Sequence, residues 1–586
     1  MLWKIYLLSL TALVGASQLP LPGDTCTLRD HSVLPQLSKY INSLAKQFKI
    51  PGLSLAVVYA DDDEPEYFNL GVRSEEGESS SEDTLYCIAS NSKAFTATAL
   101  GILIDDFEHG RNVTALPGGV EFGWKTKLAD LLPDEWALKD QWASEKTNLI
   151  DMLSHVTGLP RHEFSYAPGE TLQEMVETLR YLEPTFEFRE RFQYNNMMYC
   201  TASYIIQKYS GQSHMSFVAE RLFKPLGMNS STFFPEVAFN SGMLAESWLD
   251  TAGPGFNETR RVPYFLPEWT EAVVALNAGP GGVISSARDL THWVRTLLNE
   301  GTNPFTREQV IPKSVLDTVT VGHSMEAGKG MFPELSPTVY GGGWERWSYA
   351  GHEMIQHGGS VPGFSSAITL LPGDGVGILA LSNGDGMGFI LLALTARIME
   401  ELFSLPHIDW AGRFRNATAD EEPHASEPVT GPSASETLAP ISQFAGTYAR
   451  PGYYGNLTLC AWPSDPTSAC NAVLSDYALA DPDFVSQNKT TLYAFWGRVF
   501  VSHVKLSQLS NTTFSLQADS LYVSGCGKDT SPFYVRRNPQ GGALAEFGFR
   551  DSKVSGFGAW GLSAGPRERV PGQPETSSEA WFDKVE

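Results

Sequence analysis

The stretch LYCIASNSKAFTATALGILID (residues 85–105) joins a short apolar run to a longer run rich in Ala and Leu. The longer run predicts a buried helix over 94–105 that begins near Asn91 and has Ser90 at its N-terminal end. Unpaired N–H groups at a helix N-terminus stabilise an oxyanion. Lys93 projects from the same helical face as Ser90, and burial favours a neutral amine that can accept or relay the Ser90 proton. The stretch predicts a serine nucleophile with a lysine base; an ordinary N-cap serine beside a solvated lysine is the alternative.

The Ser-x-x-Lys spacing does not decide between these alternatives, because the chain contains three further copies. Those copies begin at Ser43, Ser486 and Ser502. A second segment, Tyr194-Asn195-Asn196, supplies a phenol that can carry protons between nucleophile, amine and leaving group. The Asn196 amide can hydrogen-bond both a substrate amide and Lys93. Tyr-x-Asn also recurs in the chain, so this segment gains meaning only beside the first.

A third segment, His357-Gly358-Gly359-Ser360, lies just before the apolar run that begins at Ala367. Glycines at this place, Gly359 among them, would let a strand backbone approach a substrate closely. The Ser360 N–H could then join the Ser90 N–H as a two-donor oxyanion hole. These three segments together predict a nucleophilic site assembled from distant parts of the chain.

The order of the three segments resembles the serine β-lactamase and penicillin-binding-protein superfamily, in particular its class C-like branch of peptidase S12-like enzymes, esterases and D-aminopeptidases. Three other stretches support the resemblance. Residues 153–160 (LSHVTGLP) are similar to that branch's L-S-H-T-S-G-L, residues 279–290 (GPGGVISSARDL) to its G-G-x-x-S-x-x-D-L, and residues 340–344 (YGGGW) to its Y-G-x-G-W. The match spans roughly Leu34 to Ser404.

The resemblance implies a role for each group. Ser90 is the acylated nucleophile, Lys93 and Tyr194 share general acid/base work, Asn196 orients the substrate, and His357 lines the third wall. The implied fold is an α/β (α+β) arrangement, with an antiparallel sheet covered by helices beside an all-helical lobe and the site in the cleft between them. The resemblance implies no metal and no organic cofactor.

Two departures from the family pattern bear on the substrate. True β-lactamases usually carry Lys at the position of His357, where it attracts a substrate carboxylate, whereas His357 is mostly neutral near pH 7. Asn195 replaces the more usual Ser of the tyrosine motif. Both departures argue against antibiotic hydrolysis and favour a small-molecule ester, or a peptide or amide with small or D-residues. The alternatives are an acyltransferase or tailoring hydrolase in a secondary-metabolite pathway, and a catalytically silent binding protein on the same fold.

The chain divides into four parts by composition. We predict a signal peptide over 1–16, a hydrolase domain over 26–415, a linker over 416–440 with almost no large apolar residue, and a C-terminal domain over 441–586. Short alternating runs rich in Tyr, Phe, Val and Thr make the last part an all-β barrel or sandwich. This domain resembles the lipocalin-like modules appended to some family members.

The first residues predict secretion, because Lys4 precedes a short apolar run that is too short to span a bilayer. Seven Asn-x-Ser/Thr sequons agree with this interpretation and are candidate glycosylation sites. They lie at Asn112, Asn229, Asn257, Asn416, Asn456, Asn488 and Asn511. Of the six cysteines, which allow fifteen pairings, we predict a disulfide only for Cys460 and Cys470, ten residues apart in a β-like region.

The net charge argues against two classes of partner, and two further motifs do not meet the requirements of the sites they resemble. The formal net charge is −25, and an acidic surface repels nucleic-acid phosphates and anionic lipid, so we expect neither as a partner. No segment after the N-terminal apolar run looks like a membrane span, so we also expect no membrane anchor. The segment HEMIQH (352–357) is not a zinc helix, because its histidines are five residues apart rather than four. The GLSAG segment (561–565) lacks a later histidine and is read as a turn. We expect structural roles for His155, Arg288 and Asp289.

Overall fold

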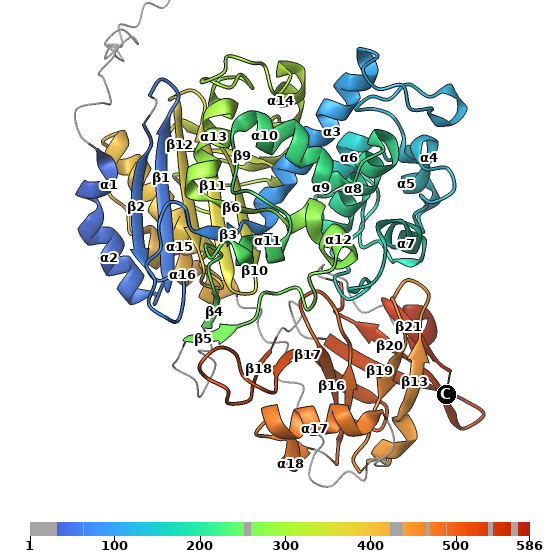
Figure 1. Cartoon of the computed structure of the whole chain (residues 1–586). Coiled ribbons are helices and arrows are strands. Elements are labelled where there is room, and N and C mark those ends of the chain that lie inside the picture. Colours follow the sequence, from blue (N-terminus) through green and yellow to red (C-terminus); the bar gives the residue numbers. More distant parts are fainter. Residues whose placement is uncertain are drawn as a thin grey trace, which may run out of the picture.

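The chain folds into a larger N-terminal domain and a smaller C-terminal domain (Figure 1). The structure is a computed structural model that describes residues 32–62, 64–250, 259–421, 438–463, 469–487, 489–536, 543–563 and 572–585. The predicted signal peptide lies outside the described residues. Within the predicted linker, helix α16 (Trp410–Glu421) continues beyond residue 416, and residues 422–437 are outside the described part.

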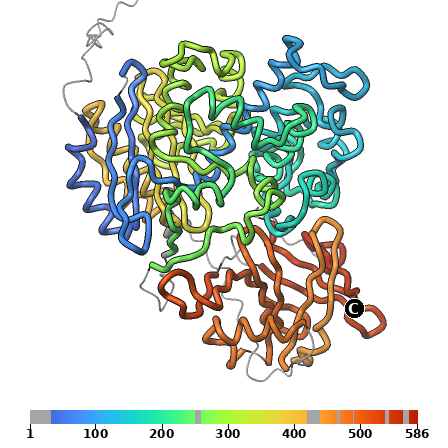
Figure 2. Tube along the Cα trace, in the orientation of Figure 1, coloured from blue at the N-terminus to red at the C-terminus, as the bar shows by residue number. Residues whose placement is uncertain are grey.

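An eight-stranded antiparallel sheet forms the centre of the N-terminal domain, in the order β2-β1-β12-β11-β10-β9-β8-β7. Its strands are β1 (Gly52–Tyr59), β2 (Glu66–Gly71), β7 (Ser324–Ala327), β8 (Thr338–Tyr340), β9 (Glu345–Tyr349), β10 (His352–Val361), β11 (Phe364–Leu371) and β12 (Val376–Ser382). Strand β1 pairs with β12, so two segments that are far apart in the sequence lie side by side (Figure 2). The apolar run that begins at Ala367 lies in strand β11.

The central strands β1, β11 and β12 are buried on both faces of the sheet. Alternate side chains of each strand point to opposite sides and so join different apolar clusters. In β12, Ile378 and Ala380 join one apolar cluster, whereas Leu379 and Leu381 join another. Helix α15 (Gly388–Leu402) packs on the first face and α13 (Ala287–Leu298) on the second. Two helices precede β1 in the chain, α1 (Val33–Gln36) and α2 (Ser38–Gln47), and Leu37 separates them.

A helical lobe lies beside the sheet, as Figure 1 shows, and α3 (Ser92–Glu108) runs into it. Nearly every residue of α3 is buried, which confirms the predicted core helix. The other helices of this domain are α4 (Leu128–Leu131), α5 (Gln141–Lys146), α6 (Leu149–Leu153), α7 (Leu172–Thr178), α8 (Asn196–Ser210), α9 (His214–Val218), α10 (Lys224–Leu226), α11 (Pro235–Asn240), α12 (Glu271–Gly281) and α14 (Lys313–Val319). Two small ribbons complete it: β3 (Leu85–Cys87) with β6 (Ile284–Ser286), and β4 (Ser247–Asp250) with β5 (Thr259–Val262).

The C-terminal domain is a nearly closed, barrel-like antiparallel sheet, which confirms the predicted β architecture. Its strands are β13 (Gly446–Ala449), β14 (Leu457–Leu459), β15 (Thr491–Phe495), β16 (His503–Gln508), β17 (Thr513–Tyr522), β18 (Phe533–Arg536), β19 (Ala543–Arg550), β20 (Lys553–Trp560) and β21 (Ala580–Lys584). The strands are hydrogen-bonded in the order β14-β13-β21-β20-β19-β17-β16-β15, and β18 pairs with β17. Cys460, just after β14, exchanges two backbone hydrogen bonds with Tyr493 of β15 (2.7 and 2.9 Å), which brings the two ends of this order together. Three short helices, α17 (Cys470–Ala480), α18 (Phe484–Gln487) and α19 (Pro574–Ser577), are additions that the sequence did not predict.

The predicted disulfide is present, since Cys460 and Cys470 are bonded. A cross-link over a loop of this length stabilises a domain by about 2–3 kcal/mol, mainly by restricting the unfolded chain. We therefore expect the free energy of unfolding of the Cys460→Ser, Cys470→Ser double variant to be about 2–3 kcal/mol lower than that of wild type. Its urea midpoint should be lower accordingly when unfolding is followed by tryptophan fluorescence. Cys526→Ser, which removes a half-exposed free thiol, is the control. Equal midpoints for the double variant and the oxidised wild type would contradict the expectation.

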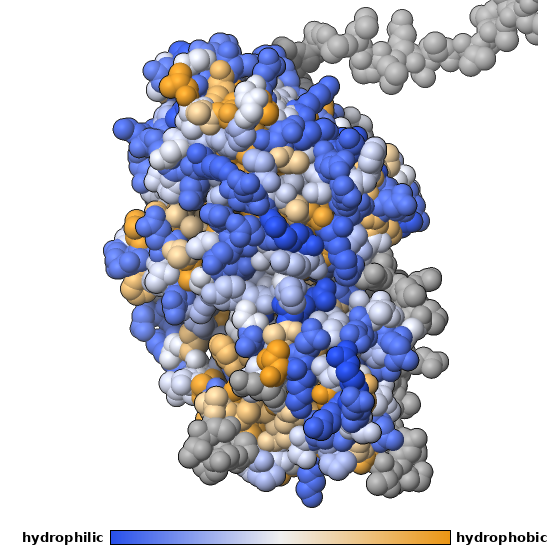
Figure 3. Space-filling view, turned by 90° about the vertical axis from the view of Figure 1, so that its right-hand side faces the viewer, coloured by the Kyte–Doolittle hydropathy of each residue, from blue (hydrophilic) through white to orange (hydrophobic). Residues whose placement is uncertain are grey.

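The surface of the molecule is mostly polar on the side drawn in Figure 3, with apolar residues gathered in a few places. Among the helices of the described residues, none combines the length and apolar character needed to cross a bilayer.

Candidate active site

Ser90 lies in a short 3-10 helix (Ala89–Asn91) between β3 and α3. The residue before it, Ala89, has a φ of 48°, in the left-handed region that non-glycine residues rarely adopt. Strain of this kind costs about 1–3 kcal/mol and persists where surrounding contacts hold it. Here the Ser366 hydroxyl donates to the Ile88 carbonyl (2.7 Å) and accepts from the Asn91 amide (2.8 Å). The turn that presents the serine is therefore fixed from both sides.

The structure brings the three predicted catalytic side chains together. The Tyr194 hydroxyl donates to Ser90 Oγ at 2.8 Å, and Lys93 Nζ lies 3.1 Å from the same oxygen. Lys93 Nζ also donates to Asn196 Oδ1 and to the Pro280 carbonyl, both at 2.8 Å. With these two acceptors satisfied, a neutral Lys93 amine would have its lone pair directed at the Ser90 hydroxyl.

Burial sets the protonation of these groups. Lys93 is fully buried, and desolvation, followed by the positive charge of Arg161, lowers its pKa well below the usual value. Burial raises the pKa of Tyr194, so the phenol keeps its proton near neutral pH, although Arg161 opposes this shift. The site thus pairs an amine that is easily deprotonated with a phenol that is not, which is the division that a base and a proton donor require.

Asn196 links Lys93 to two residues that sequence reasoning did not identify. Its amide nitrogen donates to Glu163 Oε1 (2.8 Å), and the same carboxylate oxygen accepts from Arg161 (2.9 Å). The Arg161 guanidinium lies over the Tyr194 ring, 4.4 Å from its centroid. Arg161 and Glu163 lie just after the 153–160 stretch, and this closeness to a family motif is the one sequence signal that could have identified them.

His357 is neutral and turned toward the protein. Burial, and then the charge of Lys93, lowers the pKa of His357 to about 3. Its Nε2 is 2.9 Å from the Tyr340 hydroxyl and its Nδ1 is 2.5 Å from the Gly358 carbonyl. A proton on Nδ1 serves the carbonyl and leaves Nε2 to accept from Tyr340. His357 lines the cavity beside Ser90 but gives it no positive charge.

Gly359 brings the β10 backbone close to the nucleophile. A Cβ at this position would lie 2.2 Å from the Ile88 carbonyl oxygen and 2.3 Å from Ser366 Oγ, so only glycine fits. Strand β10 pairs with β9 no further than Gln356, which leaves the following segment unpaired by β9. Ser360, in that segment, lines the same cavity as Ser90. The oxyanion role of the two backbone N–H groups stays a prediction that this placement permits.

These residues border a cavity of about 770 Å³. The charged side chains around it are Arg161, Glu163, Glu326, Glu345, Asp385 and Arg498. Burial raises the pKa of Glu345 to about 6, so its carboxyl group is still mostly ionised at pH 7. The cavity is therefore acidic on the side of His357.

Other predicted positions have structural roles. His155 is fully buried against the Tyr194 ring (centroids 4.5 Å apart), and its Nδ1 accepts from the Asn195 N–H at 3.1 Å. Asn195 caps α8 by accepting from the Met197 N–H. Asp289 is buried and accepts from Ser231, as expected of a structural carboxylate.

The HEMIQH segment forms strand β10 rather than a helix. In a strand, residues five apart point to opposite faces. His352 contacts Asp374, whereas His357 faces Tyr340.

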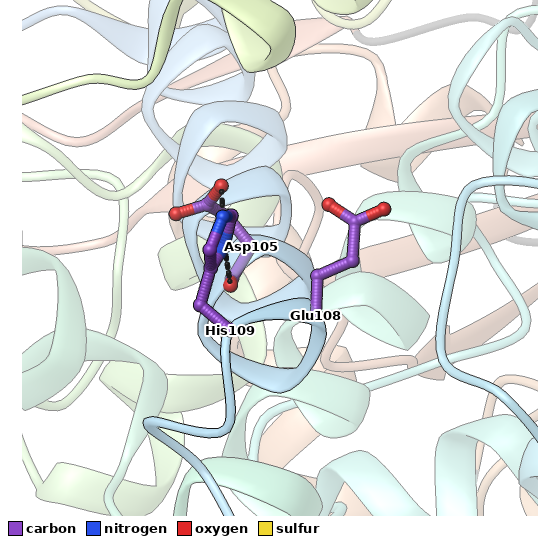
Figure 4. A group of neighbouring side chains, drawn as sticks. All are labelled: Asp105, Glu108 and His109. Atoms are coloured by element: carbon purple, nitrogen blue, oxygen red, sulfur yellow. Dashed lines mark hydrogen bonds and ion pairs between the residues drawn. The ribbon is translucent and has the colours of Figure 1, made fainter.

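Three side chains of the types that bind metal ions lie together at the C-terminal end of α3: Asp105, Glu108 and His109 (Figure 4). Arg111 already pairs with Asp105 there, so the group is an ion-pair cluster. It lies about 25 Å along the helix from Ser90, at 1.5 Å per residue.

Comparison with known proteins places this site in context. Residues 37–401 match the family model "Beta-lactamase". The unguisins hydrolase ungD' of Aspergillus campestris is 27% identical over 434 residues, covering 71% of this chain and 76% of that protein. Penicillin-binding protein 4 of Amycolatopsis lactamdurans is 24% identical over 416 residues, covering 70% and 96%. The crystal structure of SurE, 17% identical, superposes with a TM-score of 0.50 over 94% of this chain and 99% of SurE, a likeness of fold that extends over both domains.

Proposed function

Because the chain belongs to the beta-lactamase family, we propose that it is a secreted serine hydrolase that forms an acyl-enzyme at Ser90 with an ester, amide or peptide substrate. One observation carries the proposal: Ser90 Oγ lies within hydrogen-bond distance of both Lys93 Nζ and the Tyr194 hydroxyl, at the edge of a cavity. An isolated N-cap serine with a solvated lysine would have none of these contacts.

The geometry suggests the order of steps. Neutral Lys93 takes the Ser90 proton as Oγ attacks the substrate carbonyl carbon, and the carbonyl oxygen becomes an oxyanion. The N–H groups of Ser90 and Ser360 would hold that oxyanion. As the tetrahedral species collapses, the bond to the leaving group breaks and Tyr194 supplies its proton, regaining one from Lys93. Water then attacks the acyl-enzyme by the same route in reverse and releases the acid.

The charges around the cavity support a substrate without a carboxylate next to the scissile bond. His357 stays neutral at the place where a cation would attract such a group. Glu345 lines the cavity nearby, is mostly ionised at pH 7 and repels anions, whereas burial and the charge of Glu345 raise the pKa of the neighbouring Glu326 to about 8, so that carboxyl group is mostly protonated. The relative named as an unguisins hydrolase supports hydrolysis over a silent binding role, as does the presence of Ser90, Lys93 and Tyr194 together.

A substrate panel tests this preference. We expect measurable, Ser90-dependent turnover of 4-nitrophenyl esters or D-aminoacyl amides, and turnover of nitrocefin, whose carboxylate would face the ionised Glu345, about 5- to 30-fold lower, as one unfavourable charge contact of about 1–2 kcal/mol predicts. Steady-state kcat/KM for each compound is the measurement. Nitrocefin as the best substrate would contradict the assignment of substrate class.

The same acyl-enzyme could pass its acyl group to an alcohol or amine instead of water. The cavity of about 770 Å³ has room for an acceptor beside the acyl group, which keeps acyl transfer as the second candidate. Adding an amine acceptor during ester turnover and quantifying amide against free acid separates the two reactions.

Secretion is part of the proposal. The signal peptide and two sequons, Asn257 and Asn488, lie outside the described residues. Of the other sequons, Asn112 is half-buried and its side chain donates to the Tyr209 carbonyl. The remaining asparagines are exposed, as glycosylation requires: Asn229, Asn416, Asn456 and Asn511.

A further inference from the structure

The C-terminal domain forms part of the wall of the catalytic cavity. Phe500, Val501 and Leu562, all from this domain, line the same cavity as Ser90. Phe500 and Val501 belong to the connection between β15 and β16, residues 496–502, which we call the 496–502 loop. Val501 and Leu562 are almost fully buried although Val501 comes from a loop and Leu562 from the segment that follows β20. Apolar side chains at these places face the space where a substrate would lie.

Specific contacts hold the 496–502 loop against the N-terminal domain. Arg498 is buried, and its guanidinium donates to the Phe164 carbonyl of the N-terminal domain (2.7 Å). It also donates to the Tyr454 carbonyl of its own domain (3.0 Å), and the Tyr454 N–H in turn donates to the Ser165 carbonyl of the N-terminal domain (2.8 Å). The Trp496 ring stacks on Phe164, with centroids 5.4 Å apart. These contacts fix the loop beside Glu163, the residue that accepts a hydrogen bond from Asn196. The wall is therefore anchored to the catalytic network itself.

The position of Tyr194 shows which part of a substrate meets this wall. Tyr194 protonates the leaving group in the proposed mechanism, and its ring lies 6.3 Å from that of His357. The leaving group consequently occupies the His357 end of the open β10 segment. That segment runs from His357 past Ser360 to Val361, which also lines the cavity. The acyl group must extend the other way, toward Val361 and the 496–502 loop.

We propose, on the basis of the proposed function, that Phe500, Val501 and Leu562 form with Val361 and Phe164 a subsite for an apolar acyl side chain. All five line the cavity, and four of them are at least nine-tenths buried. Phe500 is half-exposed and is supported from behind by the Phe265 ring, at 6.1 Å. The C-terminal domain thereby selects the acyl group that the N-terminal domain cleaves. A side chain of phenyl or branched aliphatic type fits this lining.

Matched esters test the subsite through the acyl group alone. We expect Phe500→Ala to lower the ratio of kcat/KM for 4-nitrophenyl phenylacetate to that for 4-nitrophenyl acetate about 10-fold, as the loss of one apolar contact predicts. Phe495→Ala is the matched control, because Phe495 immediately precedes the loop and is 59% exposed. Val501→Trp, which fills the subsite, should lower the same ratio at least as far as Phe500→Ala does. An unchanged ratio in Phe500→Ala and Val501→Trp would overturn the subsite.

A binding measurement separates this inference from the proposed function. In a Ser90→Ala background, which cannot be acylated, we expect phenylacetanilide to bind about 10-fold more tightly than acetanilide by isothermal titration calorimetry. Adding Phe500→Ala should abolish that difference, whereas adding Phe495→Ala should preserve it. If wild type shows no Ser90-dependent turnover, the proposed function fails, and these affinities still decide the subsite. Equal affinities of the two anilides for Ser90→Ala would refute it.

Discussion

Ser90→Ala is expected to lower kcat for 4-nitrophenyl ester hydrolysis about 10⁶-fold, the loss typical of a serine hydrolase without its nucleophile. No other group can take its place. Among the described hydroxyl groups that line the cavity, Ser90 is the one whose oxygen lies within hydrogen-bond distance of both Lys93 and Tyr194. The methyl group of alanine fits the half-buried site without a clash, so the fold should persist. Ester turnover should be measured beside the uncatalysed reaction, since esters hydrolyse slowly in water.

Covalent labelling gives a second readout of the same variant. A fluorophosphonate probe should label wild type on the peptide that contains Ser90 and should leave Ser90→Ala unlabelled. Ser43→Ala is the matched control, because Ser43 begins another Ser-x-x-Lys copy but is exposed on α2. A folded Ser90→Ala protein that still hydrolyses esters at the wild-type rate would show that the nucleophile lies elsewhere.

The catalytic core was predictable because its residue types and their order are restrictive. Ser90 and Lys93 are one helical turn apart, so local geometry alone brings them together. The convergence of Tyr194 depends on the tertiary fold, and the sequence indicated it only through the resemblance of the ordered motifs. The structure adds the reason for Gly359, whose missing side chain lets β10 approach the Ile88 carbonyl.

The partners of these residues could not be predicted, because their contacts carry no local pattern. The Pro280 carbonyl accepts from Lys93 across 187 residues, and a backbone oxygen leaves no trace in composition. Glu163 is one of many acidic residues, and only the fold places it beside Asn196. Phe500 likewise reads as an ordinary aromatic of a β region; its position in the catalytic cavity follows from how the two domains meet.

Lys93→Met is expected to lower kcat/KM about 10³- to 10⁴-fold, the upper part of the range for loss of a general base. The pH dependence gives the sharper test. Wild-type kcat/KM should rise with pH as Lys93 loses its proton, with an apparent pKa well below 10.5, because burial and Arg161 disfavour the charged amine. The variant should lack this rising limb. Lys46→Met, which removes an exposed lysine of another Ser-x-x-Lys copy, should keep it.

The stability of the protein should also depend on pH through Lys93. Since the folded pKa of Lys93 is lowered, the unfolded chain binds more protons between that pKa and about 10.5, and in this window wild-type stability increases as pH rises. Below the folded pKa the full cost of burying the charged amine is present. Lys93→Met removes that cost while nearly conserving side-chain length, but it also leaves the Asn196 Oδ1 and Pro280 carbonyl oxygens without this donor, which costs about 1–3 kcal/mol for each buried acceptor. The expected signature is therefore the pH dependence: in urea unfolding at several pH values, the free energy of unfolding of Lys93→Met should lack the rise that wild type shows between the folded pKa of Lys93 and about pH 10.5. A variant with the same rise as wild type would contradict a lowered pKa for Lys93.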